Sequence, residues 1–169
     1  PARVHGDVVR TVPFDQLHLD DDSLKALRNA VRVFHATDGV HWTEVDIDAG
    51  GSNASMPSVL WTGTQFALRA PGPTGAQLWL SPDGVAWQQA TLPAGTELMS
   101  FGALADGTLI LAGRFNGEPA AYTSADGTAW SGVSLAAQLA LDPTWRMQQW
   151  QLVTSPLGVS LLISAGQDP

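Results

Sequence analysis

The stretch Trp79-Leu80-Ser81-Pro82-Asp83-Gly84-Val85-Ala86-Trp87 decides the fold, because two close copies of it occur at 34–42 and 122–130. The Asp of the three copies stands at positions 38, 83 and 126, so the copies are 45 and 43 residues apart. An aromatic residue lies four positions before each Asp, and a Trp lies four positions after it. Repetition at such a period predicts a fold in which one supersecondary unit is stacked several times.

Each copy has the chemistry of a tight turn between two strands. Gly accepts the positive φ of such a turn, and an Asp carboxylate accepts hydrogen bonds from nearby backbone amides. Apolar residues alternate after each Trp, as they do in a half-buried strand. We therefore expect a hairpin at each copy, with its two aromatic residues opposite each other across the strands. The residues assigned to these structural turns are Asp38, Gly39, Trp42, Ser81, Asp83, Gly84, Trp87, Ser124, Asp126, Gly127 and Trp130.

A second pattern, of two apolar stretches around a Gly-containing turn, precedes the second and third copies at 58–68 and 100–113 and recurs at 152–166. We interpret it as an inner hairpin. An inner and an outer hairpin make four antiparallel strands in about 40 to 45 residues, the size of one propeller blade. The sequence therefore predicts an all-β fold of β-propeller blades, with about two whole blades and a half-blade at each end.

The predicted organisation begins with an N-terminal segment at 1–31, in which 23–31 are expected to form a short helix, and continues with propeller repeats over 32–169. We expect an outer half-blade at 32–48, whole blades at 56–93 and 98–135, and an inner half-blade at 150–166. Because propeller rings usually contain about four to eight blades, three interpretations stay open. The chain is part of a longer propeller, two copies join head to tail, or the first 31 residues contain further strands.

The turns resemble the Asp-box, also called the bacterial neuraminidase repeat, in a shortened form with Asp and Gly adjacent. The stretches 81–87 and 124–130 carry the resemblance, which extends over about residues 32–166. In that family the box is structural and lies on the outer hairpin of propeller blades, in sialidases, sortilin-type receptors, some glycanases and photosystem assembly factors. The resemblance implies a fold and not an activity.

Composition argues against several classes of function. The net charge is −8, with one Lys and seven Arg against 16 acidic residues, so nucleic acid is not an expected partner. No apolar run reaches the roughly 20 residues that a membrane helix requires. The chain has no Cys, which removes disulfides, thiol nucleophiles and thiolate zinc sites. We expect no cofactor.

A sialidase-like site would need three clustered Arg, a Tyr nucleophile with a neighbouring Glu, and an Asp as acid and base. The one tyrosine, Tyr122, stands at the aromatic position before the third turn, which favours packing. Arg69 and Arg114 follow inner-strand segments and are placed to face a central channel, but two Arg do not make a triad. The sequence therefore predicts no catalytic residue.

The connection at 136–150 is longer than the one between the preceding repeats and contains Trp145, Arg146 and Trp150. A Trp beside an Arg suits the stacking of a sugar or the binding of a peptide, whereas the alternative is a packed inter-blade loop. The candidate ligand-binding residues are Trp145, Arg146, Trp150, Arg69 and Arg114.

His35 and His41 flank the first Asp and would lie on one face of its hairpin, close enough to share a metal. The other two copies have no His at these positions, so a metal is not part of the repeat. We predict no metal site.

These observations favour a non-catalytic propeller module for binding or scaffolding, with its ligand surface on inter-blade loops. The expected partners are a carbohydrate, a protein or peptide, a second copy of the chain, or the remainder of a longer propeller. A secreted or cell-surface location is expected. The alternative is part of a sialidase-like or other propeller glycoside hydrolase whose catalytic residues lie largely outside this chain.

Overall fold

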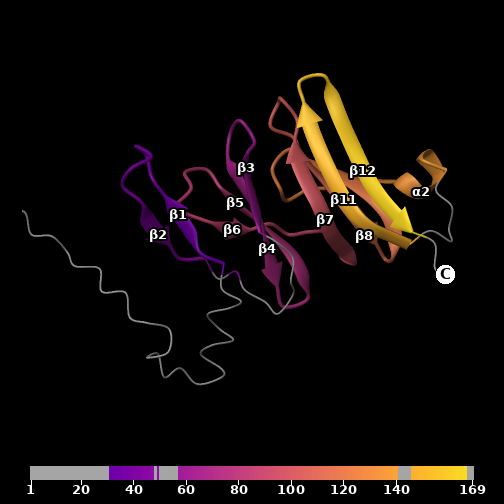
Figure 1. Cartoon of the computed structure of the whole chain (residues 1–169), viewed down its shortest axis with the longest axis horizontal. Coiled ribbons are helices and arrows are strands. Elements are labelled where there is room, and N and C mark those ends of the chain that lie inside the picture. Colours follow the sequence, from indigo (N-terminus) through magenta and orange to yellow (C-terminus); the bar gives the residue numbers. More distant parts are fainter. Residues whose placement is uncertain (1–30, 48, 50–56, 141–145, 167–169) are drawn as a thin grey trace, which may run out of the picture.

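The computed structural model describes residues 31–47, 49, 57–140 and 146–166. Within them the chain forms four small antiparallel sheets, which follow one another in sequence order (Figure 1). The predicted antiparallel β-structure is therefore confirmed. No sheet closes on itself within the described part of the chain. The helix expected at 23–31 falls almost wholly on residues outside this part.

The first two sheets contain the first two turns. The first sheet pairs β1 (Val33–His35) with β2 (Thr43–Val45). The second has the order β3-β4-β5-β6, with bounds Ser58–Trp61, Phe66–Gly72, Gly75–Ser81 and Gln88–Gln89. Each strand pairs with its neighbour in the sequence, because short turns connect antiparallel strands directly.

The last two sheets have four strands and two strands, the reverse of the order in the first two. The third sheet has the order β7-β8-β9-β10, with bounds Thr96–Ala103, Leu109–Phe115, Glu118–Ser124 and Ser131–Ser134. The short helix α2 (Leu135–Gln138) follows it. The fourth sheet pairs β11 (Arg146–Ser155) with β12 (Gly158–Gly166). Two sheets thus have four strands, and the sheets at both ends have two.

The register of the outer hairpins corrects one prediction. The aromatic residue before each turn is opposite the sixth residue after the Asp and not opposite the Trp at the fourth: Trp79 pairs with Gln89, and Tyr122 with Gly132. The Asp carboxylate binds the N–H groups of the two residues after the Gly and keeps them in the turn. Strand pairing therefore starts later on the second side, and the reversal is centred on the Gly.

Three apolar clusters lie between consecutive sheets, so the sheets stack face to face. Because neighbouring residues of a strand point to opposite faces, β4 contributes to two clusters. Its Leu68 packs with Trp79 and with Val33 of the first sheet, whereas Ala67 packs with Phe101 and Leu109 of the third. The third cluster joins Ala112, Leu135 and Trp150 to Leu152, Leu161 and Ile163 of the last two strands.

The turn glycines make close contact with the preceding sheet. A Cβ on Gly84 would lie 2.6 Å from Nδ1 of His35, and a Cβ on Gly127 would collide with the Cδ1 atom of Leu80. His35 and Leu80 stand at the same position of the repeat, so both interfaces are built in the same way. Glycine is favoured there by its φ of +77° or +79°, and its lack of a Cβ allows this close approach.

Candidate functional site

The second and third turns use their Asp carboxylates for structure. Ser81 Oγ accepts a hydrogen bond from the Gly84 N–H (2.8 Å) and donates one to Asp83 Oδ1 (3.0 Å). The same Oδ1 atom accepts the N–H groups of Val85 and Ala86 at 2.9 and 2.8 Å. These bonds, led by those from Ala86 and Val85, favour the ionised carboxyl and lower the pKa of Asp83.

The third turn repeats this network. Ser124 Oγ accepts the Gly127 N–H at 2.8 Å and donates to Asp126 Oδ1 at 3.1 Å. The backbone and hydroxyl groups of Thr128 contribute most to a lowered pKa of Asp126. An exposed carboxylate held by so many donors is suited to fixing a turn and unsuited to accepting a proton near neutral pH.

The first turn has Ala36 in place of the Ser, and a histidine takes over part of its role. His41 Nδ1 lies 2.5 Å from Asp38 Oδ2, and the N–H groups of Val40 and His41 bind Oδ1. These bonds, that of the His41 side chain first, lower the pKa of Asp38 from 3.8 to about 2. His35 lies against Gly84 instead. The structure thus gives the two imidazoles different partners, and its described residues contain no group of three His, Cys, Asp or Glu that could hold a metal.

The tryptophans of the second and third turns lock these hairpins through their indole N–H groups. Trp87 Nε1 donates to the Gly84 carbonyl at 3.0 Å, within its own turn. Trp130 Nε1 donates to the Thr91 carbonyl at 2.9 Å, in the segment after the second sheet. Trp42 of the first turn is exposed, as is Phe34 before it. The two later copies are therefore packed on a preceding sheet, and the first one presents its aromatic residues to solvent.

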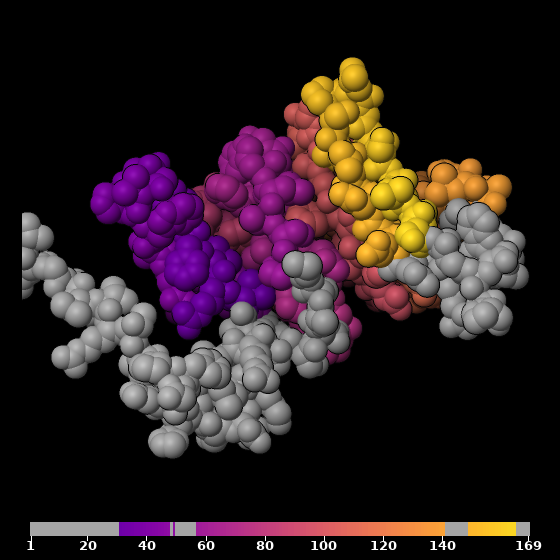
Figure 2. All heavy atoms as spheres, viewed as in Figure 1, coloured from indigo at the N-terminus to yellow at the C-terminus, as the bar shows by residue number. Residues whose placement is uncertain are grey.

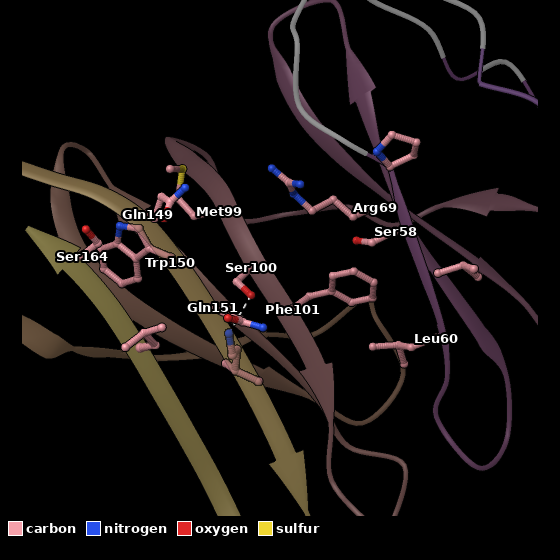
Figure 3. A pocket seen from close by; sticks show the side chains of 14 residues that line it. Ser58, Leu60, Arg69, Met99, Ser100, Phe101, Gln149, Trp150, Gln151 and Ser164 are labelled. Carbon is pink, nitrogen blue, oxygen red and sulfur yellow. Dashed lines mark hydrogen bonds between the residues drawn. The ribbon is translucent and has the colours of Figure 1, made fainter.

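A cleft of about 820 Å³ lies where the first strands of three sheets, β3, β7 and β11, approach each other (Figure 3). A volume between about 300 and 1,000 Å³ is typical of small-molecule sites. Its wall is mixed in character: apolar surface comes from Leu60, Phe101 and Trp150, and polar groups come from serine, glutamine and arginine side chains. The polar lining residues are Ser58, Arg69, Ser100, Gln149, Gln151 and Ser164.

Arg69 brings a positive charge to this cleft. It comes from β4, is half-buried, and extends towards β7, where its Nε donates to the Leu98 carbonyl at 3.4 Å (Figure 3). Burial lowers the pKa of Arg69 from its ordinary value, but a guanidinium keeps its proton at physiological pH. The charge therefore lies at the wall of a partly enclosed space, where electrostatic interactions are stronger than in water.

Ser100 and Trp150 form the opposite wall. Ser100 Oγ accepts the Leu152 N–H at 2.9 Å, which ties β11 to β7 and leaves the hydroxyl its own hydrogen to donate. Trp150 is 8 % exposed and packs in the third cluster, and its Nε1 has no hydrogen-bond partner among the described residues. Trp150 is thus buried in the third cluster and contributes one side of its ring to the wall of the cleft.

The structure brings together some of the predicted ligand-binding residues. Arg69 and Trp150 line the same cleft, whereas Arg114 lies on β8 and is not among the lining residues. Trp145 lies outside the described residues, and Arg146 begins β11. Sequence reasoning missed the Ser and Gln residues of the wall. They could have been found from the sequence as polar residues at alternating positions of the inner hairpins, which place them on one face of a strand.

Tyr122 has the surroundings of a packing residue. Its ring contacts that of Phe115 at 5.9 Å between centroids, and burial raises the pKa of its hydroxyl. A raised pKa disfavours the phenolate that a nucleophile would need. Only Arg69 among the arginines of the described chain lines the cleft. A sialidase-like constellation is therefore not assembled within the described residues.

Comparison with family models, curated proteins and solved structures finds no significant match. The likeness to the Asp-box therefore stays a resemblance of the turn residues alone. Across the residues that the structure covers, no helix combines the length and apolar character that a membrane crossing requires.

Proposed function

We propose that this chain is part of a β-propeller and acts as a non-catalytic binding module, with its ligand in the cleft between β3, β7 and β11. The propeller part of the proposal is supported by two four-stranded antiparallel sheets, stacked face to face and joined by equivalent turn contacts. The first strands of successive blades line the central channel of a propeller, and the cleft lies on these strands.

The observation that carries the binding role is the convergence of one guanidinium with several hydroxyl and amide groups on a concave wall. Arg69 suits a carboxylate, because its planar N–H groups match the two oxygens. Ser58, Ser100 and Gln151 offer donors and acceptors of the kind that sugar hydroxyls pair with. The apolar surface of Phe101 suits the C–H face of a sugar ring. The ligand we propose is therefore a saccharide that carries a carboxylate.

Titration calorimetry with glucuronate and N-acetylneuraminate, and with glucose as a neutral control, tests this proposal. Both acids are expected to bind more tightly than glucose. Arg69→Gln should weaken their binding by roughly 10- to 100-fold, since a hydrogen bond to a charged group contributes about 1.5 to 3 kcal/mol. Arg114→Gln is the matched control, because it removes a half-buried Arg from the corresponding strand of the next sheet and leaves the cleft intact. Equal binding of acids and glucose, or equal loss in both variants, would contradict the proposal.

The non-catalytic part is tested separately with a panel of fluorogenic glycosides. We expect no turnover above the uncatalysed rate. Turnover that disappears when a single acidic residue is replaced would show that the module is a glycoside hydrolase instead.

A further inference from the structure

The first sheet leaves an open slot beside β1. Within the described part of the chain, β1 pairs with β2 only, so its other edge carries backbone groups without a strand partner. Next to this edge, Val59 of β3 is 61 % exposed and Trp61 is also exposed. A cavity of about 330 Å³, lined by Val33, Phe34 and Val59 among others, lies between the two strands.

The third sheet shows what normally covers this face. Phe101 of β7 is equivalent to Val59 of β3. Phe101 pairs with Leu111 and Val59 pairs with Leu68, and each Leu packs towards the preceding sheet. Phe101 is only 7 % exposed because Leu60 and Ala67, on the first two strands of the preceding sheet, pack on it. Among the described residues the first sheet consists of an outer hairpin alone, so no inner hairpin covers Val59 there.

The last sheet corresponds to an inner hairpin, and no outer hairpin accompanies it in the part of the chain that the structure describes. Among the described residues β11 and β12 pair only with each other, so β12 has a free edge of its own. On the face of this hairpin that points away from the third sheet, Leu162 is 65 % exposed and Val153 is also exposed, among serine and glutamine side chains. The hairpin therefore has the strand order, the free edge and two exposed apolar side chains, Val153 and Leu162, that suit the slot.

The two elements lie at opposite ends of the stack of sheets, with three interfaces between them (Figures 1 and 2). One copy therefore does not bring its own β12 to its own β1. A second copy supplies the same hairpin and offers the same slot in return.

We propose that two copies of this chain exchange these elements: β12 of each copy pairs antiparallel with β1 of the other and completes a four-stranded sheet, β11-β12-β1-β2. Each copy then contributes two whole sheets, and the pair shares two composite ones. Counted over the described residues of two copies, the resulting ring has six sheets, within the range of about four to eight that closed propellers contain. Two identical contacts related by a two-fold axis close the assembly. This inference depends on the propeller part of the proposed function, and the hairpin face that it uses also contributes Gln151, Leu162 and Ser164 to the wall of the cleft.

The two four-stranded sheets predict which residues of β12 and β1 pair in the composite sheet β11-β12-β1-β2. The aromatic residue before the turn is opposite a Leu of the second strand in both: Leu68 pairs with Trp79, and Leu111 with Tyr122. Leu161 is the corresponding residue of β12, because it also packs towards the preceding sheet. It follows Val159 by two residues, just as Leu68 follows Phe66. Leu161 should therefore face Phe34 of the second copy, which places Ser160 opposite His35.

The first test is the molar mass of the purified chain by light scattering. One copy weighs 17.8 kDa, and we expect a species of twice that mass. A monomer at micromolar concentration would overturn the proposal, since it would show that the slot is empty or filled by the chain itself. Open-ended oligomers that grow with concentration would overturn it too, because they would show that the contact does not close a ring.

Disulfide trapping tests the register, and the chain has no native Cys to interfere. After mixing His35→Cys chains with Ser160→Cys chains and mild oxidation, we expect a covalent dimer, since antiparallel partners are about 4.5 to 5.5 Å apart at Cα, within disulfide range. Thr43→Cys replaces His35→Cys in the control. Thr43 is the β2 partner of His35, one strand further from β12, and should not link. Equal linking in both mixtures, or none in the first, would refute the register.

A matched pair of surface variants separates loss of dimer from loss of fold. Leu162→Arg places a charge on the face that enters the slot and should give a monomer with unchanged circular dichroism. Leu157→Arg changes the fully exposed turn of the same hairpin and should leave the dimer intact. A dimer that survives Leu162→Arg would place the interface elsewhere.

Discussion

Replacing Ser81 with Ala removes the hydroxyl that ties the second turn together from inside. Ser81 is 0 % exposed, and its Oγ accepts the N–H of Gly84, which is also buried. A buried N–H left without a partner costs about 1 to 3 kcal/mol. The variant also loses the hydrogen bond to Asp83, but this carboxylate is exposed and can bind water instead, so the loss adds little to the cost. We therefore expect Ser81→Ala to lower the free energy of unfolding by about 2 kcal/mol.

Thermal and urea unfolding followed by circular dichroism measures this change. For a chain of this length each kcal/mol shifts Tm by about 2 to 4 °C, so Tm should fall by about 4 to 8 °C. Ser124→Ala should give a similar loss, because the third turn has the same bonds. Ser131→Ala, on the exposed face of β10, is the control and should change stability by less than about 0.5 kcal/mol. A Ser81→Ala variant as stable as this control would refute the structural role of the turn hydroxyl.

Three further outcomes follow from the same turns. Gly127→Ala should destabilise the protein by about 1 to 3 kcal/mol more than Gly117→Ala in urea unfolding, because both glycines have positive φ but only the first would push a Cβ against Leu80; equal losses would contradict the packing argument. His41→Ala should raise the pKa of Asp38 from about 2 towards 3.8, as measured by NMR of the carboxyl carbon, because the His41 side chain is the largest cause of the lowered value; an unchanged pKa would assign the shift to the backbone amides alone. Since the folded pKa of Asp38 is below its unfolded value, its contribution to stability is present above pH 4 and is lost as the pH falls towards 2, so the difference in unfolding free energy between wild type and Asp38→Asn should shrink over that range.

Much of the local structure could be predicted from the sequence because the turn chemistry is local. An Asp followed by Gly brings its own acceptor and its own tolerance of positive φ, and the same backbone hydrogen bonds are found at 38, 83 and 126. The register of the aromatic residues could not be predicted in the same way. It depends on how many residues the carboxylate holds in the turn, which shifts the pairing by two positions.

The cleft was only partly visible in the sequence. Arg69 was singled out because it follows an inner strand, but Ser58 and Ser100 carry no motif and are ordinary strand residues. They line one cleft because β3 and β7 are the first strands of successive sheets, and the cleft lies between these sheets. No pattern within either strand indicates that the two serines line the same cleft.

The sequence by itself determined which residues reverse the chain and which faces of the strands are apolar, because hydrogen bonding within a turn and the alternation of a strand involve only near neighbours in the chain. The tertiary structure alone decided which apolar faces are covered. Val59 and Phe101 occupy equivalent positions, yet one is exposed and the other buried, because burial depends on whether another sheet lies against the strand.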